Sequence, residues 1–258
     1  MKKFFTIATL VALSLVSCAE EQSQSGVEGE GRVKINLSID NVVEVTRATT
    51  AIECETPSQE DFSVTIEGVD HTFSKSFASI AEFNNDYYLV GGQYKATVVA
   101  GDVTEEGYNK PTFVGSQEFT IQPRKQIEAE VVAYIANALV KVEVTEAFAN
   151  YFVGGYTFDV VTEAGNTFED VTTNANPLFV APASFTVKGT ATKQANQSGS
   201  EGVTVTLPEF KAESVEAQTL YTVKFDVEHA GQATLTIKLN DEPVESVVID
   251  TELNDNAQ

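Results

Sequence analysis

The sequence contains few of the residues on which catalysis and metal binding usually depend. Its 258 residues include two His, two Cys, one Met and no Trp. No Gly-x-Ser-x-Gly, His-Glu-x-x-His, Walker or Cys-x-x-Cys motif is present. His71 and His229 lie far apart in polar, turn-like stretches, a context typical of surface histidines. We therefore expect a protein that is not an enzyme and that carries no metal ion or cofactor.

Positive charge is also scarce. Lys and Arg together number 16 against 38 Asp and Glu, which gives a net charge of −22, and the arginines are Arg32, Arg47 and Arg124. Such a negative field repels phosphate backbones, which excludes nucleic acids as partners. The acidic clusters lack the spacing of an EF-hand loop, so we expect a solvated surface rather than a Ca²⁺ site at each. These clusters are Glu82 with Asp86, Glu105-Glu106 and Asp241-Glu242.

The apolar run at the start of the chain is too short to cross a bilayer, which takes about 20 residues. It follows two lysines and covers Phe4 to Val16, which predicts a secretory signal peptide over residues 1–18. Small residues before Cys18 resemble the lipobox of bacterial lipoproteins. The resemblance implies cleavage before Cys18 and lipidation of its sulfur, which would anchor the protein in the outer membrane. The alternative is an ordinary signal peptide with an incidental Cys.

Residues 19–30 (AEEQSQSGVEGE) are polar and predict a flexible tether. The start of this segment, Ala19-Glu20-Glu21, lacks the Asp next to Cys that is associated with inner-membrane retention. It resembles the acidic export signal of Bacteroidetes lipoproteins. This resemblance implies a lipid-anchored position on the outer face of the cell.

Beyond the tether, apolar and polar residues alternate in one segment after another, as half-buried strands require. Gly- and Asn-containing turns separate the segments, and helical periodicity is limited to single turns at Ile80–Phe83 and Glu146–Tyr151. These observations predict an all-β fold, most simply antiparallel β-sandwiches. The expected strands lie around residues 33–39, 62–66, 94–100, 127–135, 140–144, 156–160, 185–187, 203–207, 221–227 and 235–239.

The two halves of the chain show collinear similarities that indicate an internal duplication. The aligned segments are 33–37 with 140–144, 62–66 with 156–160, 72–73 with 167–168, 87–94 with 178–185, and Phe119 with Phe210. We therefore expect two tandem sandwiches, over residues 31–136 and 137–258. The junction leaves little linker, so the two should form a fairly rigid rod.

Two kinds of residue leave alternatives open. Cys54 is the one thiol that remains after lipidation of Cys18, so it is either an inert loop cysteine or part of an intermolecular bridge. Tyr87, Tyr88 and Tyr108 could stack on sugar rings, but such residues more often belong to a core or a sheet edge.

Four segments taken together resemble a family of Bacteroidetes surface lipoproteins that carries a domain of unknown function. They are Gly31–Leu37, Gly92–Val98, Gly115–Ile121 and Ala136–Val142. The plan of lipobox, short tether and two transthyretin-like or Ig-like sandwiches is similar to that of fimbrillin-like proteins, the major and minor subunits of fimbriae. The resemblance implies adhesion or pilus assembly, with fimbrial subunits or host or glycan ligands as partners.

The same resemblance implies a possible role for Arg47 as a cleavage site. In fimbrillin-like subunits, cleavage after an Arg beyond the first strand frees that strand, and a strand of the next subunit fills the groove. Arg47 follows the strand expected at residues 33–39, so it is a candidate processing site. The alternative, which we favour, is an uncut loop Arg in an anchor or accessory protein.

Two classes of function follow. The first is a non-enzymatic surface lipoprotein that acts as a fimbrillin-like adhesin or as a pilus anchor, tip or accessory component. The second is a surface glycan-binding lipoprotein that serves an outer-membrane importer. The absence of Trp favours the first class, because sugar-binding surfaces often present aromatic platforms.

Overall fold

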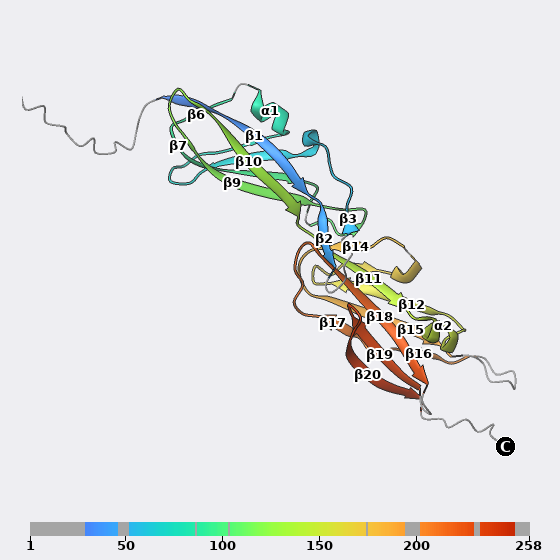
Figure 1. The fold of residues 1–258 in the computed structure, drawn as a ribbon. Coiled ribbons are helices and arrows are strands. Elements are labelled where there is room, and N and C mark those ends of the chain that lie inside the picture. Colours follow the sequence, from blue (N-terminus) through green and yellow to red (C-terminus); the bar gives the residue numbers. More distant parts are fainter. Residues whose placement is uncertain are drawn as a thin grey trace, which may run out of the picture.

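The computed structural model describes residues 29–45, 52–85, 87–102, 104–173, 175–193, 202–229 and 233–250. The first half of the chain, residues 29–135, and the second half, residues 138–250, lie end to end (Figure 1). β1 begins at the end of the first half that is remote from the second half, and β20 lies at the opposite end of the molecule (Figure 1). No helix in the described ranges is long and apolar enough to cross a membrane.

The first half forms one continuous seven-stranded sheet in the order β5-β4-β7-β9-β10-β1-β6. The elements of the first half, including those outside this sheet, are β1 (Glu30–Asp40), β2 (Val42–Val45), β3 (Ile52–Glu53), η1 (Gln59–Asp61), β4 (Ser63–Gly68), β5 (Ser74–Phe77), α1 (Ile80–Asn84), β6 (Tyr88–Val90), β7 (Gly92–Ala100), β8 (Gly107–Tyr108), β9 (Phe113–Ile121) and β10 (Gln126–Ile135). β9 joins the two faces of the fold, because it pairs with β7 along its length and with β10 only over Phe113–Gly115. Gly115 permits this crossing, since a Cβ there would lie 2.4 Å from the Val132 carbonyl oxygen.

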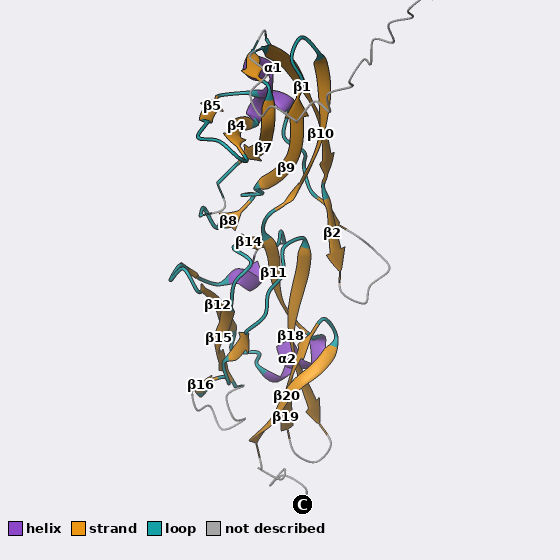
Figure 2. Cartoon of the chain, turned by 90° about the vertical axis from the view of Figure 1, so that its left-hand side faces the viewer, coloured by secondary structure: helices purple, strands orange, loops and turns teal. Residues whose placement is uncertain are grey.

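The second half packs two sheets face to face (Figure 2). The larger runs β20-β19-β18-β11-β14-β8, and the smaller runs β13-β12-β15-β16 with β17 also on β15. The elements are β11 (Ala138–Val144), α2 (Glu146–Tyr151), β12 (Tyr156–Thr162), β13 (Thr167–Phe168), η2 (Val171–Thr173), β14 (Leu178–Val180), β15 (Phe185–Thr192), β16 (Thr204–Thr206), β17 (Phe210–Ala212), β18 (Thr219–His229), β19 (Ala233–Leu239) and β20 (Glu242–Asp250).

The expected all-β fold is confirmed, but three strand pairs among the described residues are parallel, so the sheets are mixed rather than antiparallel throughout. β1 pairs in parallel with β10, β11 with β18, and β18 with β2. In each half the first strand lies beside a later strand that starts from the same end, so the two run in one direction. Side chains alternate with period two in both kinds of sheet, and the sequence pattern therefore could not distinguish them.

The buried side chains form two separate clusters. The first half contributes Val33, Phe62 and Tyr94 among others, and the second contributes Phe158, Phe185 and Phe225. Burial of each such side chain favours folding by about 1.5–3 kcal/mol. Three residues of the second half, Leu139, Phe179 and Leu220, belong to the cluster of the first half. The two cores therefore meet at the junction, and the boundaries expected at residues 31–136 and 137–258 remain a prediction.

The strand pairing agrees with the main part of the internal alignment. β1 pairs with β10 and β6, and β11 makes the same two kinds of pair with β18 and β14. Arg32 lies opposite Tyr88, and Leu139 lies opposite Phe179, as the aligned positions require. The two halves thus repeat one arrangement of strands.

Two of the matches predicted between the halves, Phe73 with Phe168 and Phe119 with Phe210, are displaced by two residues in the structure. Ile66 corresponds to Val160, but the partner of Ile66 is Lys75, whereas the partner of Val160 is Phe168. Phe73 therefore does not correspond to Phe168. In the same way, the residue equivalent to Phe119 is Ala212 and not Phe210, because these two lie opposite the aligned Tyr94 and Phe185. A shift of two keeps a side chain on the same face, so the alternation gave no warning.

Candidate functional site

The two residues predicted to be modified, Cys18 and Arg47, lie outside the described residues. The structure does describe 29–45, which form β1 and β2 and lie between the two sites in the sequence. These strands show what the predicted anchor would be attached to and what cleavage after Arg47 would remove.

β1 is bonded on both sides. Nine of its residues pair with β10, and its first residues pair with β6. Beyond β6, the Asn84 side chain at the end of α1 takes the place of a neighbouring strand. Its Oδ1 accepts a hydrogen bond from Ile35 N at 2.8 Å, and its Nδ2 donates to Ile35 O at 3.0 Å. Because Ile35 is only 2% exposed, these bonds satisfy backbone groups that water does not reach.

Two short strands of the first half complete the sheet of the second half. The end of β2 pairs in parallel with the start of β18, and Val43 of β2 is fully buried. β8 pairs with β14 and is the outermost strand at one edge of the same sheet. The junction is therefore made by strand pairing as well as by side-chain packing.

Glu106, next to β8, links the two halves through one carboxylate. Its Oε2 accepts hydrogen bonds from Thr162 Oγ1 at 2.6 Å and Asn166 Nδ2 at 2.8 Å, and its Oε1 accepts one from Ala181 N at 2.9 Å. All three donors belong to the second half. The expectation of a purely solvated acidic cluster at Glu105-Glu106 is thus wrong for Glu106, which has a structural role.

Hydrogen bonds also fix the connection between β10 and β11. Asn137 Oδ1 accepts from Thr112 N at 2.6 Å, and Asn137 O accepts from Gln218 N at 2.9 Å. In the described ranges, Thr112 Oγ1 and Asn137 Nδ2 are the buried side-chain atoms without a hydrogen-bond partner.

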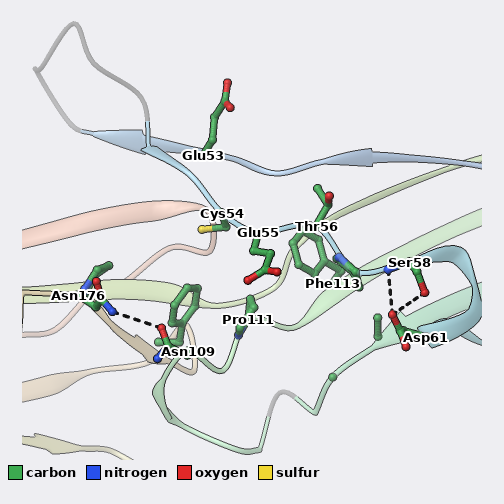
Figure 3. Close-up of a pocket in the computed structure, with 15 residues that line it drawn as sticks. Glu53, Cys54, Glu55, Thr56, Ser58, Asp61, Asn109, Pro111, Phe113 and Asn176 are labelled. Atoms are coloured by element: carbon green, nitrogen blue, oxygen red, sulfur yellow. Dashed lines mark hydrogen bonds between the residues drawn. The ribbon is translucent and has the colours of Figure 1, made fainter.

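A pocket of about 540 Å³ opens at this junction, and we call it the junction pocket. Its walls are residues 53–58 and 61, residues 100–101, residues 109, 111 and 113, and residues 176, 177 and 179. Figure 3 shows the pocket with the 53–58 segment along one side and the loops before β9 and β14 along the other. Both halves of the chain therefore contribute to it, as is common for ligand sites.

The acidic residues of the junction pocket are not equivalent. The Glu55 carboxylate points into the space above Pro111, whereas the Glu53 side chain points away from the other labelled residues (Figure 3). Asp61 Oδ2 accepts hydrogen bonds from Ser58 N at 2.9 Å and Ser58 Oγ at 2.7 Å, and these bonds lower the pKa of Asp61. Glu55 is therefore the carboxylate that faces the pocket.

Cys54 lines the same pocket and is half-buried. Its backbone is fixed by Asn41, whose O accepts from Cys54 N at 3.1 Å and whose Nδ2 donates to Cys54 O at 2.7 Å. Partial burial raises the pKa of the Cys54 thiol, which lowers the fraction of reactive thiolate at neutral pH. Whether Cys54 is an inert loop cysteine or part of an intermolecular bridge stays a prediction.

The remaining sequence candidates do not gather into a site. The Asp70 carboxylate accepts a hydrogen bond from His71 Nδ1 at 2.8 Å, and the His71 ring packs edge-on against Tyr94, with ring centroids 4.8 Å apart. Tyr87 packs against Phe77 and lies under the Lys75 ammonium group, 4.2 Å from its ring centroid. Tyr88 is exposed on β6, an edge strand of the sheet of the first half, whereas Tyr108 lies on β8, which pairs with β14 in the larger sheet of the second half. These tyrosines share no binding platform.

Sequence reasoning missed the residues that form the junction. Glu55, Asn109 and Asn176 line the pocket, but none lies in a motif that marks a ligand. The Asn-Pro step at 176–177 signals a turn and nothing more. No group of three or more His, Cys, Asp or Glu residues suited to a metal ion occurs in the described ranges.

Solved structures with a similar course of the chain come from Bacteroidetes. One is the fimbrial anchor protein Mfa2 from Porphyromonas gingivalis, with 8% identity, a TM-score of 0.41, and coverage of 84% of this chain and 100% of that chain. A second, from Bacteroides thetaiotaomicron, is described as a proposed polysaccharide-binding protein, with 9% identity, a TM-score of 0.39, and coverage of 88% and 100%. A third, a proposed adhesin from the same organism, has 11% identity, a TM-score of 0.35, and coverage of 86% and 99%. At TM-scores this low, the likeness does not carry over a function.

A comparison with curated proteins gives no match. A family model matches residues 29–255, which include both halves and the junction between them. Its description is "Domain of unknown function (DUF4493)", and the match extends over most of the chain. The expected membership in a family with a domain of unknown function is thereby confirmed: this chain belongs to the DUF4493 family.

Proposed function

We propose that the protein is a non-enzymatic, lipid-anchored protein of the cell surface that acts as an adhesin or as a pilus anchor, tip or accessory component. The observation that carries this proposal is the direction of the chain. β1 begins at the end of the first half that is remote from the second half (Figure 1). A lipid on Cys18, joined to β1 by the polar tether 19–30, would therefore place the second half farthest from the membrane.

The junction supports this role mechanically. Strand pairing by β2 and β8, together with the bonds to Glu106, joins the halves over several independent contacts. A distal half joined in this way would be held away from the membrane without a freely jointed linker. Such a spacer suits a protein that presents a surface to partners.

A subcellular fractionation experiment tests the anchor. Cys18→Ser removes the acyl acceptor, so the variant should leave the membrane fraction and become salt-soluble, while the wild-type protein stays with the outer membrane. Ser17→Ala is the matched control, because it keeps the thiol and a small residue before it. A Cys18→Ser protein that still sediments with membranes and resists salt extraction would overturn the lipid anchor.

Processing after Arg47 is a separate part of the proposal. Cleavage there would remove β1 and β2 together, because both strands precede residue 47. The first half would lose the strand between β10 and β6, and the second half would lose the strand at the start of β18. Two gaps would result, one in each sheet, and each would need a replacement strand.

We favour the uncut form, because the buried side chains of β1 and β2 belong to the core of the first half and β2 also pairs with β18 of the second half. Mass spectrometry of protein isolated from its native cells distinguishes the forms. An anchor or accessory protein should yield only the lipidated chain that begins at Cys18. A polymer-associated chain that begins at Ala48 would instead identify the protein as a strand-exchanging subunit.

The alternative of a glycan-binding lipoprotein has less support. Phe113 and Phe179 in the junction pocket are only 1% and 7% exposed, so neither offers a flat ring face to a sugar. Binding of the purified protein to fimbrial subunits, compared with binding to an oligosaccharide array, separates the two classes.

A further inference from the structure

We propose that the junction pocket binds an extended, basic segment of a partner protein, with a Lys or Arg side chain directed at Glu55 and apolar residues beside it. The inference deepens the proposed function and rests on it for the existence of a partner at the cell surface. The binding itself depends only on the pocket and can be measured with purified protein.

The charge of the pocket selects a cation. None of its lining residues is Lys or Arg, whereas Glu53, Glu55 and Asp61 are all acidic. Lys110 is a neighbour of the wall, but its Nζ is bonded to Glu105 Oε2 at 2.8 Å. Among the residues that the structure describes, the negative charge of the lining is therefore uncompensated, and Glu55 is the carboxylate that points into the pocket (Figure 3).

The floor of the pocket suits the aliphatic part of a basic side chain. The half-buried rings of Pro111 and Pro177 offer an apolar surface, whereas the Phe113 and Phe179 side chains are almost fully buried in the wall. Long cationic side chains place their methylene groups against such surfaces and keep the charged end near an acceptor. A cation alone, without an apolar stem, would leave this surface exposed to water.

The rim supplies groups that can bond to a peptide backbone. Asn109 and Asn176 lie next to each other at one end of the pocket, where Asn176 Nδ2 donates a hydrogen bond to Asn109 Oδ1 at 3.5 Å (Figure 3). Asn109 has a positive φ of 57°, a conformation that Asn tolerates better than most residues and that fixes the direction of its side chain. Carboxamides of this kind donate and accept, as a main chain requires.

Charge also decides which chain can occupy the pocket. A second copy of this protein is disfavoured, because both copies carry a net charge of −22. The terminal segments 19–30 and 251–258 contain no Lys or Arg and so offer nothing to Glu55. A different, basic protein is the occupant that the charges favour.

Fluorescence anisotropy tests the proposal with a labelled octapeptide of alternating Lys and Val. The control probe replaces every Lys by Glu. The Lys peptide should bind the wild-type protein, and Glu55→Gln should weaken its binding by at least about fivefold. Glu53→Gln is the matched control, because it removes the same charge two residues away from a side chain that points elsewhere, and it should change the affinity little. The titration is repeated with Arg47→Gln protein. An unchanged affinity for the Lys peptide is expected, because Arg47 of the chain itself should not compete with the peptide for Glu55.

Cys54 provides a second readout inside the pocket. In Cys18→Ser protein, Cys54 is the one remaining thiol, and bound Lys peptide should slow its alkylation by iodoacetamide, whereas the Glu peptide should not. Equal binding of both peptides, equal losses in Glu53→Gln and Glu55→Gln, or unprotected Cys54 would each overturn the proposal. Protection by maltohexaose without protection by the Lys peptide would also overturn it and would assign the pocket to a glycan. None of these results depends on where the protein lies in the cell, so a failure of the anchor would be seen separately by fractionation.

Discussion

Single, partly buried polar residues connect elements of the second half. Asp226 on β18 is the clearest case, because its two carboxylate oxygens serve two elements. Oδ1 accepts from Thr145 Oγ1 at 2.6 Å, and Oδ2 accepts from Lys238 Nζ at 2.6 Å. Thr145 is also the N-cap of α2, where its hydroxyl accepts from Phe148 N at 3.2 Å. One carboxylate thus connects β18 with β19 and with the start of α2.

The protonation of Asp226 makes this connection dependent on pH. Burial alone would raise the pKa of Asp226, but the hydrogen bonds from Lys238 and Thr145 and the Lys238 charge outweigh it and lower the pKa. A lowered pKa in the folded state means that the stabilisation is complete above the unfolded pKa of about 3.9 and is lost as pH falls through the folded pKa. The loss therefore occurs on the acid side, below about pH 4.

Asp226→Asn should lower the free energy of unfolding by about 1–2 kcal/mol at pH 7, because it weakens two charge-assisted hydrogen bonds. The difference from the wild-type protein should shrink as the pH falls from 5 to 3. Urea unfolding followed by circular dichroism at each pH measures it. Asp241→Asn is the control, since Asp241 binds Lys224 at 2.6 Å but is 78% exposed, and exposed pairs contribute little. A pH-independent difference for Asp226→Asn would show that the charge is not the cause.

At the scale of an element, the attachment of β1 differs along its length. β10 supports nearly all of β1, whereas β6 supports only its first residues. The Asn84 side chain then continues the row of hydrogen bonds at Ile35. A side chain that imitates a strand leaves less paired backbone to separate than a full strand would, so this side of β1 is the more easily opened one.

Asn84→Ala should therefore loosen β1. It leaves the buried N–H and C=O groups of Ile35 without partners, which costs about 1–3 kcal/mol for each group that water does not reach. Hydrogen exchange read by mass spectrometry should show faster exchange in the peptide that contains β1. Asn85→Ala changes the adjacent, exposed residue and is the matched control. Identical exchange in the two variants would mean that β10 alone holds the strand.

Some of the strands could be predicted from the sequence pattern, and others could not. Strands with regular alternation, such as β7 and β10, were predictable because their burial alternates residue by residue. β20 was missed because its charged residues and Pro243 interrupt the apolar pattern on an exposed edge. β2 and β8 have too few residues for any period to appear, although both join the halves. The junction pocket could not be predicted, since its walls are brought together only by the tertiary fold.

At the scale of the whole molecule, the second half depends on the first. β2 and β8 extend its larger sheet, and the Glu106 carboxylate binds three of its groups. Leu139, Phe179 and Leu220 are at most 7% exposed, and each packs in the cluster of the first half. The sequence predicted two self-sufficient sandwiches, and these contacts indicate that the second one is stabilised by its neighbour.

Residues 137–258 produced alone should still fold, because Phe158, Phe185 and Phe225 belong to a core that lies within this segment. The isolated segment should give a β-type circular dichroism spectrum but unfold at a lower urea concentration than the same region in the full chain. Exposure of three apolar side chains and loss of the bonds to Glu106 should reduce its free energy of unfolding by at least about 3 kcal/mol. Glu106→Ala in the full chain should reproduce part of this loss, whereas Glu105→Ala, which removes only the exposed pair with Lys110, should not. If the isolated segment unfolds at the same urea concentration as in the full chain, the halves are energetically independent, and the junction would then be a contact surface without a role in stability.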